Sequence, residues 1–145
     1  MSTVKEILDR LRSLDIHRAV KTTLGEGREL MLDLNRDQLM QGKRSDGSDI
    51  TPEYTYFTRL RKMEQGANPD VVSLYDTGDF QREMYLDVGN DTLEIDSMDD
   101  KSSELKDKYG EGIFGLDDTS RKEYVGGIFP AFKEKIENAL KLEME

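Results

Sequence analysis

The spacing of apolar residues changes twice along this chain, and that change limits the possible fold more than any other feature of the sequence. Two groups of four apolar residues have the spacing of one helix face: Val4, Ile7, Leu8 and Leu11 near the start, and Ile128, Phe132, Ile136 and Leu140 near the end. Between them, residues 84–98 alternate apolar and polar side chains, the period of a strand with one buried face. We therefore expect an α+β fold with N-terminal helices, a small antiparallel sheet with a β-hairpin, and a C-terminal amphipathic helix.

The first forty residues are predicted to form a helical arm. Thr3 and Glu6 have the spacing of a capping box, in which each side chain accepts a hydrogen bond from the other residue's backbone N–H. Helical patterns then cover residues 15–24 and 28–41, separated by Gly25 and Gly27 and followed by Gly42 as a C-terminal cap. Because each interior glycine costs about 1 kcal/mol in a helix, we expect one bent helix or two consecutive helices.

The middle of the chain is predicted to carry the turns and the sheet. Its expected elements are a turn at 43–52 around Asp46-Gly47, a short helix at 54–63, a loop at 66–70, a strand at 71–75, a tight turn at 76–79, and a hairpin that pairs 84–88 with 93–98 through Gly89-Asn90-Asp91. In the hairpin, Leu93 and Ile95 are expected on the buried face, opposite two carboxylates on the wet face.

The last part of the chain is predicted to be mostly helical. Its expected features are a short helix capped by Ser102 or Ser103 and ending at Tyr109-Gly110, an apolar anchor at Ile113-Phe114-Gly115-Leu116, and a helix from about Thr119 onward. Gly126, Gly127 and Pro130 should interrupt that helix, with Pro130 kinking it or starting its second half. A length of 145 residues suits one domain, with a helical arm at 3–41, a sheet-bearing middle at 43–100 and a helical part at 101–145.

The charge of the chain is concentrated in its middle third. The formal net charge is -10, and residues 46–100 alone hold fourteen acidic and four basic side chains. An acidic surface repels phosphate backbones, so we expect no direct nucleic-acid binding. The start of the chain lacks the apolar core of a signal peptide, and no run approaches the roughly 20 apolar residues of a membrane span, so we expect a soluble product.

The residues that usually carry catalysis are sparse or ordinary in this sequence. There is no cysteine, and His17 is a single histidine on a predicted amphipathic helix. The carboxylate pairs lie in turns and at helix starts, where aspartate commonly caps or turns the chain: Asp76 and Asp79, Asp99 and Asp100, Asp117 and Asp118. No EF-hand frame or phosphate-binding glycine loop with a lysine is present. We expect no enzyme activity, no cofactor and no metal.

The order of turns and anchors resembles the virion-morphogenesis and tail-completion proteins of tailed bacteriophages. The features that carry the resemblance are Leu39-Met40-Gln41-Gly42, Asp46-Gly47, Ile50, Pro52, Tyr54, the segment Leu74-Tyr75-Asp76-Thr77-Gly78-Asp79-Phe80, a hairpin, Ile113-Phe114-Gly115-Leu116 and a closing amphipathic helix. The similarity runs from about Leu30 to Leu140. The chain departs from the family in having Ile50 where a tryptophan is common, and Glu111-Gly112-Ile113-Phe114 where an Arg-Pro-Phe anchor is common.

The resemblance implies a non-enzymatic ring-forming or adaptor subunit between the portal or connector and the tail. It would assemble in the host cytoplasm and reside in the neck or tail of the virion. The expected interface residues are apolar anchors: Tyr54, Tyr56, Tyr75, Phe80, Ile113 and Phe114. Phe57 is expected to fill the core, Tyr54 suits either role, and the C-terminal stripe is expected to pack within the chain.

Two other functions remain open at this stage. The acidic residues 46–100 suit a cytoplasmic interaction or inhibitor module that binds a basic protein. An enzyme that uses Asp76, Asp79 or His17 is the third possibility, although no substrate follows from the sequence.

Overall fold

The computed structural model describes residues 3–13, 15–90 and 92–144, with the side chains of residues 10–13 and 141–144 left out. Its elements are, in order, α1 (Val4–Ser13), α2 (Ile16–Glu26), α3 (Arg28–Met40), α4 (Tyr56–Glu64), α5 (Asp79–Arg82), β1 (Met84–Val88), β2 (Leu93–Ser97), α6 (Ser102–Tyr109), the 3-10 turn η1 (Glu111–Ile113) and α7 (Asp118–Met144). The fold is α+β, as the changing apolar period predicts. Leu11 in the first stripe and Asp91 in the hairpin turn lie outside the described side chains.

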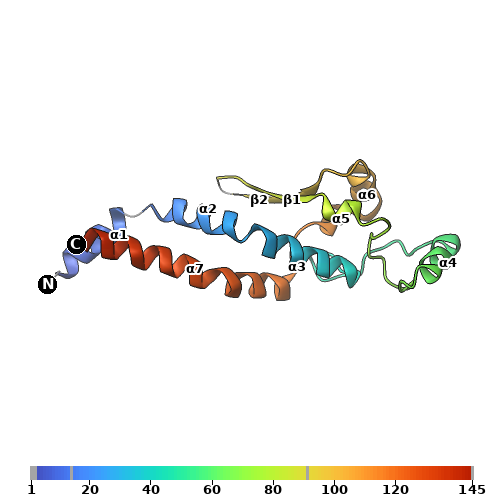
Figure 1. Ribbon diagram of the computed structural model, residues 1–145, viewed down its shortest axis with the longest axis horizontal. Coiled ribbons are helices and arrows are strands. Elements are labelled where there is room, and N and C mark those ends of the chain that lie inside the picture. Colours follow the sequence, from blue (N-terminus) through green and yellow to red (C-terminus); the bar gives the residue numbers. More distant parts are fainter. Residues whose placement is uncertain (1–2, 14, 91, 145) are drawn as a thin grey trace.

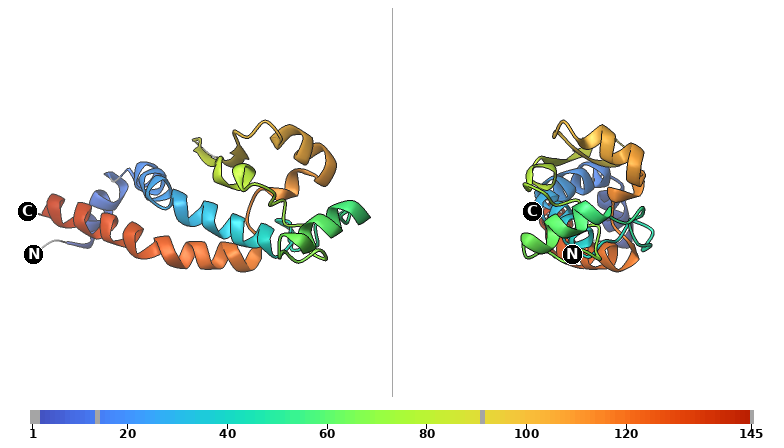
Figure 2. Two further views of the ribbon diagram at one scale, coloured as in Figure 1. Left: turned by 45° about the vertical axis from the view of Figure 1, so that its right-hand side comes forward. Right: turned by 90° about the vertical axis from the view of Figure 1, so that its right-hand side faces the viewer.

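The molecule is elongated because its longest helix runs antiparallel to the N-terminal arm. Helix α7 packs against α1, α2 and α3 in turn, so the two ends of the chain lie at the same end of the molecule (Figure 1). Helix α4 projects at the opposite end, beyond the last turn of α3 (Figures 1 and 2). The apolar stripe of Ile128, Phe132, Ile136 and Leu140 is half-buried along this contact, as expected for packing within the chain.

The predicted helix ends of the arm are confirmed by their hydrogen bonds. The Thr3 backbone N–H donates to the Glu6 carboxylate at 3.1 Å, and the Glu6 N–H donates to the Thr3 hydroxyl at 3.2 Å, which is the capping box. Helix α3 ends with Gly42 at φ +72°, whose N–H donates to the Leu39 carbonyl while the Lys43 N–H donates to the Gln38 carbonyl. This pair of bonds is a Schellman cap.

The glycines of the helices act differently from the interruptions that the sequence predicts. Helix α2 continues through Gly25 and ends before Gly27, and α7 continues through Gly126, Gly127 and Pro130 as one helix. An added Cβ at Gly27 would lie 2.7 Å from Ile128 Cγ2 of α7, and one at Gly127 would lie 2.7 Å from Leu30 Cδ2 of α3. The missing side chains therefore let α7 approach the α2–α3 junction closely, which compensates for the poor helix propensity of glycine.

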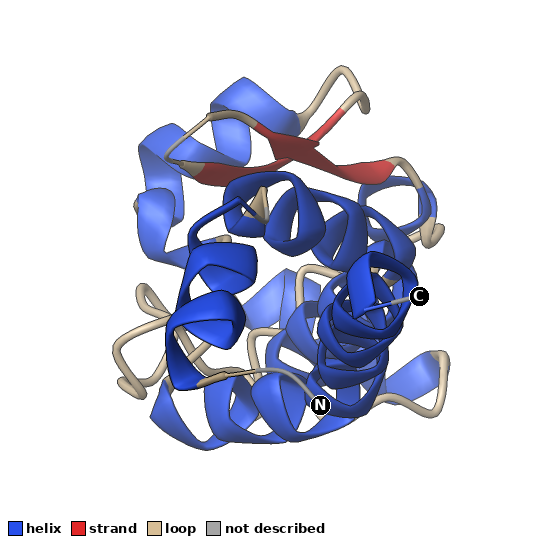
Figure 3. Cartoon of the chain, turned by 90° about the vertical axis from the view of Figure 1, so that its left-hand side faces the viewer, coloured by secondary structure: helices blue, strands red, loops and turns tan. Residues whose placement is uncertain are grey.

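The hairpin forms with the predicted strands and lies across one side of the helical body (Figure 3). Its register pairs Met84 with Ser97, Leu86 with Ile95, and Asp87 with Glu94. Met84 and Leu86 are buried against the helices, whereas Asp87 and Glu94 are exposed on the outer face. The alternation is therefore confirmed in β1, but it is wrong for β2, where Leu93 is 40% exposed, Glu94 is exposed as well, and Ile95 and Asp96 are both half-buried.

The predicted strand at 71–75 is wrong. Within the described residues this segment has no regular secondary structure and pairs with no strand, and Leu74 has a left-handed φ of +58°. Side chains satisfy its backbone instead: the Tyr54 hydroxyl accepts from the N–H groups of Ser73 and Leu74, both at 3.1 Å, and Gln81 donates to the Ser73 carbonyl. A β-like sequence can therefore leave the sheet when side chains take the place of a partner strand.

Two smaller expectations also differ from the structure. Neither Ser102 nor Ser103 caps α6, because the capping position is Lys101 and the Ser102 hydroxyl donates to Asp96 on the hairpin instead. The short helix α5 begins at Asp79, inside the turn predicted at 76–79, and its four residues are too few for a periodic pattern in the sequence.

The loop before α7 is fixed in the core by two buried polar side chains of α3. Asn35, fully buried, donates to the Ile113 carbonyl at 3.1 Å and accepts from the Gly115 N–H at 2.8 Å. Gln38 donates to the Gly115 carbonyl at 3.0 Å and accepts from the Asp117 N–H at 2.9 Å. Ile113 is completely buried beneath this loop, so the apolar anchor is an anchor to the chain's own core.

Candidate functional site

The strongest candidate site is the exposed face of α4. Four large apolar residues of this helix are exposed: Tyr56 by 70%, Phe57 by 80%, Leu60 by 40% and Met63 by 60%. Tyr56, Leu60 and Met63 fall at i, i+4 and i+7, and Phe57 lies three residues before Leu60, so all four share one face. The rings of Tyr56 and Phe57 meet edge to face with centroids 5.7 Å apart. We call these four residues the α4 outer face.

The opposite face of α4 is held to the body of the protein by cations. Lys62 is buried, with 3% of its surface exposed, and its ammonium group donates to the Tyr75 carbonyl. The same ammonium lies 5.5 Å from the centroid of the Tyr54 ring. Arg59 donates to the Pro69 carbonyl at 3.1 Å. Helix α4 is therefore inverted relative to an ordinary surface helix, which buries its apolar face and exposes its charges.

The predicted interface residues divide into two groups. Tyr54, Tyr56 and Tyr75 lie at or beside α4, with Tyr56 and Tyr75 exposed and Tyr54 half-buried. Phe80 and Ile113 are in the core, exposed by 4% and 0%, so neither can serve as a surface anchor. Phe114 is half-buried, and its ring lies 5.6 Å from that of Phe80.

The expectation that Phe57 fills the core is wrong, since it is among the most exposed large apolar residues described. An aromatic residue at helical spacing normally predicts burial, and a helix pattern by itself does not say which face meets the body of the protein. The presence of three cations in the nine residues of α4 was the available signal.

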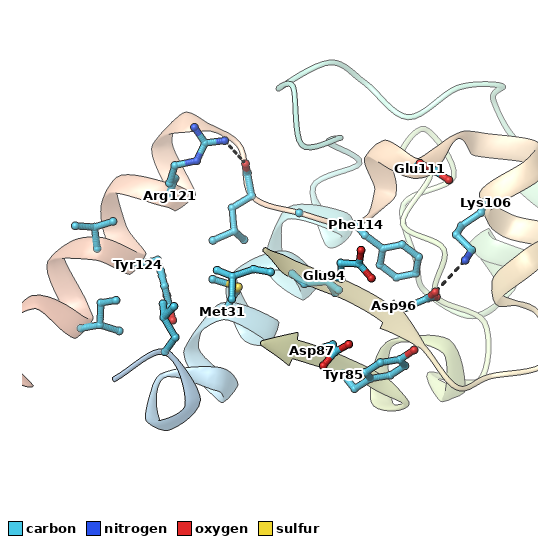
Figure 4. A pocket seen from close by; sticks show the side chains of 17 residues that line it. Met31, Tyr85, Asp87, Glu94, Asp96, Lys106, Glu111, Phe114, Arg121 and Tyr124 are labelled. Atoms are coloured by element: carbon cyan, nitrogen blue, oxygen red, sulfur yellow. Dashed lines mark hydrogen bonds and ion pairs between the residues drawn. The ribbon is translucent and has the colours of Figure 1, made fainter. Parts of the chain in front are cut away.

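A second surface feature is an open groove of about 830 Å³ between the hairpin, the loop before α7 and the start of α7 (Figure 4). We call it the hairpin groove. Its apolar lining comprises Leu24, Met31, Leu93, Ile95, Phe114, Leu116, Tyr124, Val125 and Ile128. Its charged lining comprises Asp87, Glu94, Asp96 and Glu111 against Lys106 and Arg121. The groove thus combines an apolar lining with a net excess of two carboxylates.

One carboxylate of the groove is tied into a local network. Asp96 accepts from Lys106 at 2.9 Å, from the Ser102 hydroxyl at 2.7 Å and from the Ser97 N–H at 2.7 Å. Burial alone raises the pKa of Asp96, but these hydrogen bonds, with that from Lys106 first, outweigh it and hold the pKa below its ordinary value. The network joins α6 to β2, so we assign it to fixing one wall of the groove.

The tyrosine at the α7 side of the groove has an unusual environment. Tyr124 is only 3% exposed, and its buried hydroxyl has no hydrogen-bond partner within the described part of the chain. Burial raises the pKa of this phenol above its ordinary value. A buried hydroxyl without a partner costs roughly 1–3 kcal/mol, so the ring must contribute mainly through apolar packing.

The residues considered for catalysis have structural partners or stand apart. Asp76 lies between Arg61 at 3.9 Å and Lys101 at 4.0 Å, and Asp79 pairs with Arg82 at 2.7 Å within α5. His17 is exposed on α2, far along the chain and in a different element from either aspartate. Across residues 3–13, 15–90 and 92–144, no group of three or more histidine or carboxylate side chains is placed to hold a metal ion.

No helix among the described residues has the length and apolar character needed to cross a membrane. The chain matches no protein-family model, and it matches no curated protein and no solved structure.

Proposed function

We propose that this protein is a non-enzymatic structural subunit of a tailed-phage virion, in the head–tail joining, neck or tail-completion region. It acts by oligomerisation and by contacts with neighbouring virion proteins. The observation that carries the proposal is the inverted packing of α4, which directs two aromatic rings, a leucine and a methionine into solvent at one end of the molecule.

The α4 outer face costs free energy when it is left in water. Fully burying an apolar side chain of this size stabilises a structure by about 1.5–3 kcal/mol, and the α4 outer face holds four of them. Contiguous exposed apolar patches on soluble proteins usually mark interaction sites, and tyrosine is enriched among the residues that dominate interface energies. The cations beneath α4 hold the helix in this orientation, so the exposed face is built into the fold.

The location in the virion is supported by the order of the sequence motifs. The glycine turn at 46–47, the turn at 76–79, the hairpin, the anchored loop at 113–116 and the closing helix follow one another as the resemblance implies. Phage neck and tail proteins of that kind work as rings or adaptors, a role that needs complementary surfaces and no reactive groups.

The test uses particles of the phage whose genome encodes the chain. Particles banded in a density gradient and washed with salt should contain the polypeptide in a fixed ratio to the portal protein, measured by quantitative mass spectrometry. Mixing the purified chain with portal, connector and tail-tube proteins from the same genome should give a discrete complex by native mass spectrometry. Recovery of the polypeptide only from the unassembled fraction, together with no complex, would refute the proposal.

A second candidate function follows from the outer face of the hairpin. Residues 76–100 hold nine acidic side chains and one basic side chain, and Asp87 lies directly across from Glu94. Like charges opposite one another destabilise a hairpin, so a basic protein bound there would relieve a repulsion. This interaction module predicts salt-sensitive binding to a basic protein, with affinity lost in the Glu94→Lys variant and retained in a Phe57→Asp variant.

A further inference from the structure

We propose that the α4 outer face of one copy of this chain docks into the hairpin groove of a second copy, so that copies join head to tail. This inference rests on the proposed function, because it names the contact by which the subunits would associate. The two surfaces share no residue, and each exposes apolar side chains that the chain itself leaves uncovered.

The dimensions and the apolar chemistry of the two surfaces agree. Helix α4 has nine residues, or about 13 Å of helix at 1.5 Å per residue, and its anchors occupy two turns. The groove offers about 830 Å³ with apolar side chains on both walls: Leu93 and Ile95 from the hairpin, and Val125 and Ile128 from α7. Leu93 and Val125 are 40% and 50% exposed, so the lining is accessible to an entering side chain.

An exposed cation at the edge of the α4 outer face is complementary to the acidic groove. Lys62 is buried under α4 and Arg59 pairs with Asp70 at 2.6 Å, so Arg61 is the cation of α4 that a second copy can reach. The groove is lined by four carboxylates and two cations, a net of -2. Arg61 is 56% exposed, and its ion pair with Asp76 is long at 3.9 Å, so its guanidinium is free to turn toward a carboxylate of a second copy. The exposed Asp87 and Glu94 lie side by side on the hairpin wall and would accept it.

The available area also suits an interface between copies. A buried aromatic side chain contributes about 150–250 Å². Tyr56 and Phe57 therefore supply a large share of the roughly 800 Å² that each partner buries in a standard interface, before Leu60 and Met63 are added. In the head-to-tail arrangement each α4 enters the groove of the next copy, so the contact is heterologous, and repeated copies form a ring when the rotation closes.

The test compares the full chain with two single variants, each of which disables one surface. Phe57→Asp places a charge on the α4 outer face at the second position of a helix, where aspartate is favoured. Val125→Glu places a charge on the α7 wall of the groove, at an exposed helix position. Met98→Asp, at a position that is 74% exposed and belongs to neither surface, is the matched control. Circular dichroism establishes that each variant folds.

Native mass spectrometry and light scattering should show the unmodified chain and Met98→Asp as assemblies of three or more copies. Phe57→Asp and Val125→Glu should each weaken association by about 30-fold or more, as loss of a central anchor does, and be monomeric at micromolar concentration. An equimolar mixture of these two variants should form a one-to-one dimer, because one intact α4 meets one intact groove. That dimer is specific to a head-to-tail contact.

Four results would overturn the inference: a monomeric or strictly dimeric unmodified chain, assembly of either variant alone, or a mixture that stays monomeric. If Val125→Glu assembles and Phe57→Asp does not, α4 pairs with another surface and the groove assignment is wrong. A chain that is monomeric alone but present in purified particles would leave the proposed virion role intact and remove only this contact. Absence from particles would remove the virion role, whatever the oligomeric state.

Discussion

The close approach of α7 to the α2–α3 junction can be tested with two neighbouring glycines that differ in one respect. An added Cβ at Gly25, inside α2, meets nothing within 4 Å. An added Cβ at Gly27 meets Ile128 Cγ2 at 2.7 Å and the Tyr124 hydroxyl at 3.1 Å. Gly27 has φ -86°, which alanine adopts without strain, so backbone conformation does not distinguish the two positions.

The expected magnitudes follow from two terms. Replacing glycine by alanine stabilises a compatible position by about 0.4–1 kcal/mol through the unfolded chain, and this term applies to both variants. Overpacking at Gly27 costs about 1–3 kcal/mol, because Ile128 is branched at Cβ and Tyr124 is buried, so neither contact atom can simply swing away. Gly25→Ala should therefore be more stable than the unmodified chain, and Gly27→Ala less stable than Gly25→Ala by the whole overpacking cost.

The measurement is urea unfolding followed by circular dichroism, with all three proteins at one concentration so that association contributes equally. A thermal melt gives a second measurement: a difference of 1–3 kcal/mol in the free energy of unfolding between the variants corresponds to roughly 3–12 °C in melting temperature for a domain of this size. If Gly27→Ala gains as much stability as Gly25→Ala, α7 does not contact the junction as described, and the antiparallel packing of the helical arm would have to be revised.

Three further changes have defined outcomes. Tyr124→Phe removes a buried hydroxyl that has no partner, so the free energy of unfolding should stay the same or rise by up to about 1 kcal/mol. Asp87→Lys converts the repulsion across from Glu94 into an attraction and should stabilise the protein by roughly 0.5–1 kcal/mol. The hydrogen bond from Lys106 helps to hold the pKa of Asp96 below its ordinary value of about 3.9, so this carboxylate stabilises the fold above that pH and loses its effect as the pH falls through the lowered pKa.

Urea midpoints check all three. If Tyr124→Phe lowered the free energy of unfolding by more than about 1 kcal/mol, the hydroxyl would have to have a hydrogen-bond partner. No gain in Asp87→Lys at low salt would mean that the carboxylates do not face one another. For Asp96, the difference in free energy of unfolding between the unmodified chain and Asp96→Asn should shrink as the pH falls from 7 to 3, because Asp96 becomes protonated. The other carboxylates titrate in both proteins, so their effect cancels in this difference. A constant difference would contradict the assigned hydrogen bonds.

The sequence predicts the elements whose signals are local. The capping box at Thr3, the cap at Gly42 and the alternation of β1 all depend on residues a few positions apart, and each is confirmed. The continuity of α7 through Pro130 was not predictable in this way. It depends on contacts with α2 and α3, which lie far earlier in the chain and supply the packing that the helix's own sequence lacks.

The two main errors of the sequence-based prediction, the strand at 71–75 and the burial of Phe57, are linked through the contacts of α4. The carbonyls of Pro69 and Tyr75 accept hydrogen bonds from Arg59 and Lys62 of α4. The Tyr75 carbonyl, which a strand would present to a neighbouring strand, thus holds a helix by its cation, as does the Pro69 carbonyl in the preceding loop. The helix must then turn its apolar face outward, because its charged face is already occupied.

The contacts beneath α4 also determine where the candidate site lies. A helix pattern shows that α4 has two chemically different faces, and only the acceptors available in 69–75 decide which face meets the body of the protein. Once those acceptors hold Lys62, which is 97% removed from solvent, rotating α4 to bury Phe57 would leave a buried cation or an unsatisfied carbonyl. An unsatisfied buried carbonyl costs roughly 1–3 kcal/mol and an unpaired buried cation roughly 3–5 kcal/mol, and both oppose the roughly 1.5–3 kcal/mol that burying one apolar side chain returns. The contacts of Arg59 and Lys62 therefore hold the α4 outer face toward solvent.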